Sequence, residues 1–182
     1  MIEIRRIEKE RSCDANIPNQ PFFVWGRMIP ALSEGTWSYR IERMESPTEM
    51  CFPDVPYDLA TDDGVFFGAY DADACVGVAV LRRQMFRYLY LDDLKVHAAY
   101  RGQGIGKRLI DACMEEARRT GMQGVWTIAQ DNNVSACLFY LGHGFAIGGF
   151  DNRQYRGTPQ EEKADLYFYR DCEGTHDGCD GE

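Results

Sequence analysis

The chain has 182 residues, 45% hydrophobic and 27% charged, which fits one globular domain and excludes a disordered or fibrous chain. Its 20 Lys and Arg against 29 Asp and Glu give a net charge of −9. Because nucleic acids and anionic membranes are bound largely through Lys and Arg, we expect neither as a partner and expect a small cationic ligand instead.

Alternation of apolar and polar residues predicts strands in the first third of the chain. Ile2–Ile7 and Thr36–Met44 show the period of two that a strand requires. Three prolines interrupt residues 11–35, so we expect at most a short helix or an irregular segment there. Residues 45–63 combine prolines with several acids and predict an acidic loop, which could cover a cleft for a polycationic ligand.

From residue 65 onward the sequence predicts alternating strands and helices. A helix is expected from about Gly104 to Gly121, and a short one over Asn133–Leu141. The expected strands are Val65–Tyr70 and Cys75–Leu81, which form a hairpin, then Tyr88–Val96, Gly124–Ala129, Phe145–Phe150 and Ala164–Tyr169. This order predicts a single α/β (or α+β) domain over residues 1–170, with a mixed, mostly antiparallel central sheet flanked by helices.

The ends of the chain and its cysteines predict a cytoplasmic protein. No stretch approaches the roughly 20 apolar residues that span a bilayer, and the N-terminus lacks the apolar region of a signal peptide. Seven scattered cysteines without a CxxC pair favour free thiols and argue against a disulfide framework or a metal site. Residues 171–182 contain five acids and three glycines and predict an acidic, disordered tail.

The segment Arg101–Lys107, between a strand and a helix, contains glycines at 102, 104 and 106. Glycine allows backbone amides to approach a ligand, and the N-terminus of a helix offers unpaired N–H groups and a positive dipole end. The segment therefore predicts an anion site, most naturally for a phosphate group.

The spacing of this segment excludes two familiar phosphate loops. A Walker A loop would need Gly at 101 and Ser or Thr at 108, where Arg101 and Arg108 stand. The dinucleotide fingerprint that begins at Gly102 would need a glycine at Lys107. By itself, the segment could also be a simple glycine-rich turn.

Two linked motifs resemble the GNAT superfamily of N-acetyltransferases. Arg101, Gly104 and Gly106 match its pattern of Gln or Arg, two residues, Gly, one residue, and Gly or Ala. Asn133–Tyr140, followed by Gly144 and Phe145, resembles the superfamily's next helix and strand. The resemblance covers residues 62–170. Shorter motifs resemble streptothricin acetyltransferases more closely: Gly26–Pro30, Gly35–Tyr39, Leu91–Val96, Gly148–Asp151 and Tyr155–Thr158.

The resemblance implies acetyl-CoA as co-substrate and a set of residues that bind it. Backbone amides of the glycine segment would hold the pyrophosphate, with the Arg101 side chain nearby, and the strand before it would pair with the pantetheine arm. Asn133 would bond the pantetheine, although capping its helix is an equally good explanation. The implied residues are Leu94, Lys95, Val96, Arg101, Gly102, Gln103, Gly104, Ile105, Gly106, Lys107 and Asn133.

The implied reaction is direct attack of an amine on the thioester, which needs a proton acceptor. With a pKa near 10.4, roughly one lysine-like amine in a few thousand is neutral at pH 7. Asp92 and Asp93 are the candidates, because adjacent carboxylates in an apolar strand are costly unless they react or are paired. Strand alternation would place them on opposite faces, and we favour Asp92, on the face of Tyr90 and Leu94. Alternatively, a loop or an arginine satisfies either carboxylate.

A carboxylate beside the substrate ammonium favours binding but raises the pKa of the amine, which opposes deprotonation. We therefore expect one acid to bind charge while another accepts the proton, directly or through water.

Tyr140 matches the superfamily tyrosine that protonates the departing CoA thiolate, although it could instead be a core ring. His97 and His143 match no such role and are expected at the surface, and Cys137 needs no covalent role. Beyond the sixth strand, Asp151 and Tyr155 could face the substrate.

The interpretation we favour is a cytoplasmic acetyltransferase that inactivates streptothricin at its β-lysine moiety. The alternatives are an enzyme for another amine, such as an aminoglycoside, a polyamine or a protein N-terminus, and a non-catalytic acetyl-CoA-binding module. Relatives are often dimers, and the strands at 145–151 and 164–170 could supply such a contact.

Overall fold

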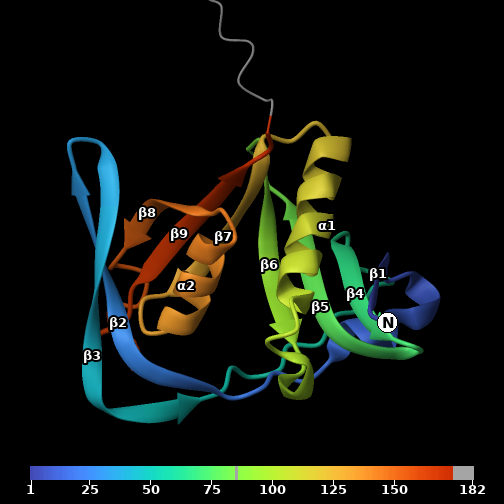
Figure 1. The fold of residues 1–182 in the computed structure, drawn as a ribbon, viewed down its shortest axis with the longest axis horizontal. Coiled ribbons are helices and arrows are strands. Elements are labelled where there is room, and N and C mark those ends of the chain that lie inside the picture. Colours follow the sequence, from blue (N-terminus) through green and yellow to red (C-terminus); the bar gives the residue numbers. More distant parts are fainter. Residues whose placement is uncertain (85, 174–182) are drawn as a thin grey trace, which may run out of the picture.

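The computed structural model describes residues 1–84 and 86–173 and contains one large sheet with a separate hairpin (Figure 1). Within these residues the strands run in the order β1, β4, β5, β6, β7, β9, β8 across the large sheet, and β2 pairs with β3 alone. Their bounds are β1 Glu3–Arg6, β2 Phe22–Ser33, β3 Thr36–Met50, β4 Val65–Asp71, β5 Ala74–Arg83, β6 Tyr88–Val96, β7 Gly124–Gln130, β8 Ala146–Asp151 and β9 Asp165–Asp171.

The large sheet is mixed and mostly antiparallel, as predicted. Of its neighbouring strands, only β6 and β7 are parallel, and the long connection between them contains helix α1 (Ile105–Arg119). Helix α2 (Val134–Gly142) follows β7. Two short 3-10 helices, η1 (Lys9–Asn16) and η2 (Ala98–Tyr100), complete the described elements.

Helix α1 covers one face of the sheet because its apolar residues recur with the helical period. Leu109, Ile110 and Cys113 are fully buried there and belong to the same core as Leu81 and Leu91 of the sheet. A second, smaller core on the opposite face joins Phe66, Val78 and Val80 to the N-terminal segment. Alternate residues of β5 thus fill two different cores, which fixes the two faces that this strand presents.

The hairpin β2–β3 corrects the prediction for residues 11–35 and 45–50. Val24, Gly26 and Met28 are buried in alternation along β2, while β3 continues to Met50. Glu34 and Gly35, both with positive φ, form the two-residue turn that right-handed strand twist favours. The prolines concealed this period-two signal, because β2 pairs on one side only and tolerates Pro30 there.

The hairpin does not extend the large sheet. In Figure 1 it stands beside α2 and the β8–β9 end of the sheet. The Met28 amide donates to the Asp131 carbonyl oxygen at 2.9 Å, and the Trp25 indole donates to the Ser135 hydroxyl at 3.0 Å. These bonds attach the hairpin to the segment that holds α2.

At the C-terminus, strand β9 continues to residue 171, the first position of the predicted tail. Asp171 belongs to β9 and accepts a hydrogen bond from the Tyr88 hydroxyl, and Cys172 is buried. The rest of the predicted tail, residues 174–182, lies outside the described residues. Among the described residues, no helix is long and apolar enough to cross a membrane.

Candidate active site

A cleft of about 930 Å³ opens where β6 and β7 separate. The two strands pair from Tyr88 with Gly124 to Tyr90 with Trp126, and beyond this point none of the described strands occupies the β7 side of β6. The Thr127 hydroxyl donates to the Leu91 carbonyl oxygen at 2.9 Å, at the apex of the opening. The cleft therefore follows from the sheet topology.

One edge of β6 has no strand partner along the cleft among the described residues, although the Val96 carbonyl oxygen accepts from Arg101. Leu94, Lys95 and Val96 pair on their other side with Ala79, Val78 and Gly77 of β5. Because each residue alternates the direction of its backbone groups, the free edge presents N–H and C=O groups that an extended ligand could pair with. All three residues line the cleft, as predicted for a pantetheine site.

The glycine segment forms the other end of the cleft, at the N-terminus of α1. Gly104 caps the helix with a φ of 76°, a left-handed conformation that side chains disfavour, and Gly102 has the same φ. The first amide to pair within the helix is that of Arg108, which donates to the Gly104 carbonyl oxygen. Residues just before Arg108 line the cleft: Gly102, Gly104, Ile105, Gly106 and Lys107. A helix N-terminus favours an anion at this place.

At position 106, helix packing also requires glycine. A Cβ built on it would lie 2.9 Å from Cζ of Phe139, so its lack of a side chain lets α1 approach α2 closely. The glycine pattern therefore combines a loop conformation at Gly102 and Gly104 with close helix packing at Gly106.

The side chains of this segment are held by the protein itself. The Arg101 guanidinium donates to the carbonyl oxygens of Val96 at 3.1 Å and Pro21 at 3.4 Å. Lys107 pairs with Asp111 at 2.6 Å, and Gln103 donates to the Ala99 carbonyl oxygen at 3.3 Å. These contacts occupy the side chains, so the backbone amides are the groups that remain for an anion, although Arg101, Ile105 and Lys107 line the cleft.

A β-bulge in β6 overturns the prediction that Asp92 and Asp93 lie on opposite faces. Val80 pairs with Asp93 and Leu81 with Leu91, so Asp92 is an extra residue without an opposite partner. Both carboxylates line the cleft. Tyr90, paired with Arg82, shares the face of Asp93, whereas Leu94 lies on the α1 face. Alternation along the sequence could not reveal the bulge.

Asp92 is held by an arginine that joins two acids. Arg82 Nε donates to Asp92 Oδ2 at 2.6 Å, and the other guanidinium nitrogens donate to both oxygens of Asp62 at 2.8 and 3.0 Å. Hydrogen bonds from Arg82, opposed by partial burial, lower the pKa of Asp62, and the two acids raise the pKa of Arg82. For Asp92, the structure thus shows the contact expected under the alternative interpretation, in which an arginine pairs with the carboxylate.

Asp93 lies between a cation and a phenol. Its Oδ2 is 3.0 Å from Lys95 Nζ and accepts from the Tyr57 hydroxyl at 3.2 Å. The side chains of Lys95 and Asp93 are only 12% and 22% exposed, so solvent screens this ion pair weakly. Burial is the main cause that raises the pKa of Tyr57, and the charge of Asp93 adds to it.

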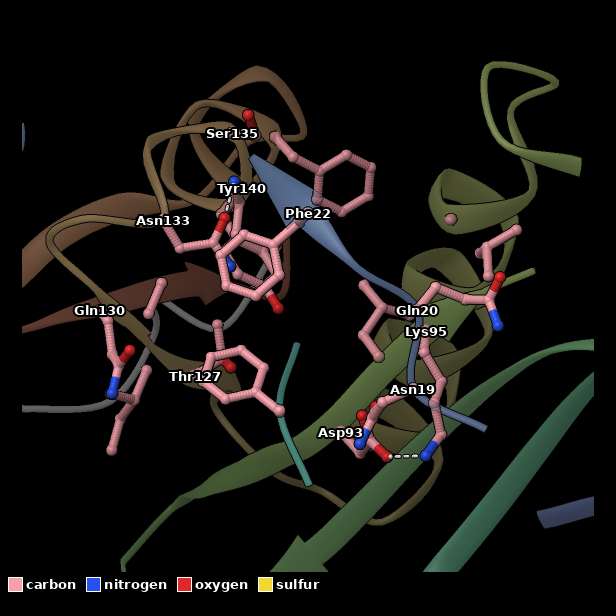
Figure 2. Close-up of a pocket in the computed structure, with 18 of the residues that line it drawn as sticks. Asn19, Gln20, Phe22, Asp93, Lys95, Thr127, Gln130, Asn133, Ser135 and Tyr140 are labelled. Carbon is pink, nitrogen blue, oxygen red and sulfur yellow. Dashed lines mark hydrogen bonds and ion pairs between the residues drawn. The ribbon is translucent and has the colours of Figure 1, made fainter. Parts of the chain in front are cut away.

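Helix α2 supplies Asn133 and Tyr140 to the opposite wall, with Ser135 nearby (Figure 2). The Asn133 side-chain oxygen accepts from the Ala136 amide at 3.2 Å and so caps the helix. Its amide nitrogen is not used by this cap. Tyr140 is buried, and burial, assisted by the charge of Asp93, raises the pKa of its hydroxyl, while a hydrogen bond with Thr127 opposes the shift.

The acidic loop lines the cleft with apolar and aromatic residues rather than with acids. Phe52, Val55 and Tyr57 face the cavity. Asp54 instead accepts from the Asn19 amide at 2.7 Å, and Asp58 from the Ala60 amide at 3.0 Å. The loop thus contributes to the wall of the cleft, while its acids Asp54 and Asp58 accept from backbone amides and Asp62 pairs with Arg82.

His97, His143 and Cys137 have structural contacts. His97 is exposed and accepts from the Ala99 amide at η2. His143 is half-buried, lines the cleft and contacts the Phe139 carbonyl oxygen at 2.6 Å, so its prediction as a surface residue was incomplete. Burial raises the pKa of Cys137 to about 12, so its thiol stays protonated near neutral pH.

Several cleft residues escaped the sequence analysis because they come from distant segments. Phe22, the first residue of the missed strand β2, lines the cleft together with Asn19 and Gln20, which precede it. Gln130 and Asp165 line it from adjacent positions of β7 and β9. Within the described residues, no group of three or more metal-ligating side chains occurs.

Comparisons with known proteins agree on one family. The sequence profile described as the acetyltransferase (GNAT) family matches residues 31–145. Streptothricin acetyltransferase A of Bacillus subtilis is 34% identical over 159 residues, which are 86% of this chain and 92% of that protein.

Solved structures extend the likeness to the whole domain. A Bacillus anthracis protein assigned as a streptothricin acetyltransferase, in complex with acetyl coenzyme A, superimposes with a TM-score of 0.86 at 28% identity, over 94% of this chain and 99% of that chain. A nourseothricin acetyltransferase shares the fold, with a TM-score of 0.77 at 24% identity, over 94% of this chain and 98% of that chain.

Proposed function

The chain belongs to the acetyltransferase (GNAT) family, and we propose that it transfers the acetyl group of acetyl-CoA to an amine of the β-lysine moiety of streptothricin, which inactivates this antibiotic. The observation that carries the proposal is the similarity to a streptothricin acetyltransferase over 92% of that relative's length. The site supports it independently, because a helix N-terminus and an unpaired strand edge form one wall and carboxylates lie beyond them.

The described residues fit the donor, which supplies the thioester. In this proposal the amides from Gln103 to Lys107 bind the pyrophosphate, and the free edge of Leu94–Val96 pairs with the pantetheine arm. Gly102 and Gly104 have open space around them, so the backbone is accessible to a ligand. Asn133 binds the pantetheine through its side-chain nitrogen, since its oxygen caps α2.

Asp93 is our proposed proton acceptor, directly or through water. Its proximity to Tyr140, whose pKa its charge affects, supports this choice over Asp92. Asp92 already contacts Arg82 and would stabilise the bulge. A carboxylate beside the attacking amine would raise the pKa of that amine and oppose its deprotonation. The positive charge of Lys95, 3.0 Å from Asp93, reduces this effect.

Tyr140 is our proposed general acid. The new nitrogen–carbon bond forms as the carbon–sulfur bond breaks, the amine proton passes to Asp93, and the Tyr140 hydroxyl protonates the departing sulfur. Because burial raises the pKa of this hydroxyl, it keeps its proton across the pH range in which a cell operates.

The test is a panel assay that follows CoA release with streptothricin, an aminoglycoside, spermidine and a peptide N-terminus. We expect the highest kcat/KM with streptothricin, and mass spectrometry should find one acetyl group on its β-lysine. Turnover of another amine without streptothricin turnover would refute the substrate. No turnover of any amine, together with tight acetyl-CoA binding, would favour a non-catalytic module.

A further inference from the structure

Three carboxylates line the cleft, and they differ in whether a positively charged side chain pairs with them. Asp92 pairs with Arg82 at 2.6 Å and Asp93 with Lys95 at 3.0 Å. The third, Asp165 at the start of β9, forms no ion pair within 4.0 Å with any residue that the structure describes. It is nevertheless only 2% exposed. A buried carboxylate is costly unless a positive charge or hydrogen bonds compensate it.

The surroundings of Asp165 are negative. Asp151 of β8 lies directly opposite it in the sheet, and like charges in this position repel. Burial raises the pKa of Asp165, a hydrogen bond from Tyr155 opposes this shift, and the charges of Asp151 and Asp131 add to it. Asp131 differs, because Arg27 lies 3.6 Å from its carboxylate and the Ala164 amide donates to it. An added cation would therefore be stabilised at Asp165.

A chain of hydrogen bonds orients Asp165. The Tyr155 hydroxyl donates to Asp165 Oδ1 at 2.9 Å and accepts from the Gln130 amide nitrogen at 3.0 Å. The Gln130 oxygen in turn accepts from Lys163 at 3.4 Å. Tyr155 and Gln130 also line the cleft, so the carboxylate is held in place at its wall.

From these observations we propose that Asp165, positioned by Tyr155, binds a second ammonium group of the acceptor, one that is not acetylated. This inference rests on the proposed function for the identity of the site, and it narrows the substrate class to amines that carry at least two positive charges. Asp93 and Asp165 then have different roles. Asp93, beside Lys95, accepts the proton, and Asp165, which has no cationic partner among the described residues, binds the second ammonium group.

The first test measures binding to the CoA-loaded enzyme by calorimetry, with 1,4-diaminobutane and 1-aminobutane as probes. We expect wild type to bind the dication at least tenfold more tightly than the monocation, and Asp165→Asn, which keeps an acceptor for Tyr155, to lower this ratio below threefold. Asp73→Asn is the matched control, because it removes one negative charge in the exposed β4–β5 turn. A ratio that Asp165→Asn leaves at the wild-type value, or no preference in wild type, would overturn the inference.

The second test separates positioning from folding. With streptothricin, Asp165→Asn should raise KM at least tenfold while kcat stays within threefold and acetyl-CoA affinity within twofold. Tyr155→Phe should raise KM less, because it keeps the carboxylate and removes only the hydroxyl that orients it, and it serves if Asp165→Asn does not fold. Equal losses in kcat and in acetyl-CoA affinity would indicate a merely structural role and contradict the proposal.

The two tests distinguish a failure of the proposed substrate from a failure of the proposed role of Asp165. If wild type does not turn over streptothricin, the proposed substrate is wrong, while the calorimetric ratio of the two butylamines still decides the role of Asp165. If streptothricin is a substrate and both Asp165→Asn measurements equal those of wild type, only the present inference fails.

Discussion

Replacing Asp93 by Asn tests the proposed proton acceptor most directly. The substitution keeps an oxygen for the Tyr57 hydroxyl but removes the negative charge and the basic site. General base catalysis contributes about 10²–10⁴-fold, so we expect kcat/KM to fall at least about 100-fold, or about 2.7 kcal/mol of transition-state stabilisation.

The same substitution has a stability cost that must be separated from catalysis. It leaves the Lys95 ammonium, 12% exposed, without the carboxylate 3.0 Å away. Losing a charged hydrogen-bond partner at a largely buried site costs about 1–3 kcal/mol, which lowers the Tm by about 2–12 °C in a chain of this length. The double variant Asp93→Asn with Lys95→Met should regain part of this stability without regaining activity.

The assay is steady-state release of CoA, with acetyl-CoA affinity and thermal unfolding measured on each variant. Asp92→Asn is the matched control, because it removes the same charge one residue away. Arg82 keeps its two bonds to Asp62, so we expect less than a tenfold loss of kcat/KM. A folded Asp93→Asn variant that binds acetyl-CoA and retains kcat/KM within tenfold of wild type would refute the reasoning. A larger loss in Asp92→Asn would transfer the role to that residue.

Two further predictions concern α2 and the glycine segment. Tyr140→Phe should lower kcat about 10–100-fold at a ratio constant from pH 6 to 9, because the raised pKa keeps the wild-type hydroxyl protonated throughout; an unchanged kcat at every pH would exclude the acid role. Because the pKa of this hydroxyl is higher in the folded than in the unfolded state, the free energy of unfolding measured in urea should fall between pH 9 and 11. It should fall less in Tyr140→Phe. Gly104→Ala should cost about 1 kcal/mol at its φ of 76° and weaken acetyl-CoA binding about fivefold. Gly157→Ala, at a φ of 74° outside the cleft, should cost similar stability without that loss of affinity, and equal affinities for the two variants would argue against the amide site.

Much of the fold was predictable because local periodicity and turn chemistry are written in the sequence. The apolar face of α1, the β4–β5 hairpin and the order of the later strands were confirmed. The glycine segment could be recognised because Gly102 and Gly104 adopt backbone conformations that other residues disfavour. Strand β2 was missed, although Val24, Gly26 and Met28 carry its signal, because prolines usually interrupt regular structure.

What the sequence by itself determined was the family's motifs, the acetyl-CoA chemistry they imply and the residue types available for catalysis. Only the tertiary structure decided which charged partner each carboxylate has. A single extra residue in β6 brings Asp92 and Asp93 to one face, and Arg82 and Lys95 then neutralise them. Asp165 lies 72 positions beyond Asp93 in the sequence, and it enters the same cleft because β9 pairs with β7. Charge can be counted along a chain, but its effect depends on burial and on neighbours, which folding alone brings together.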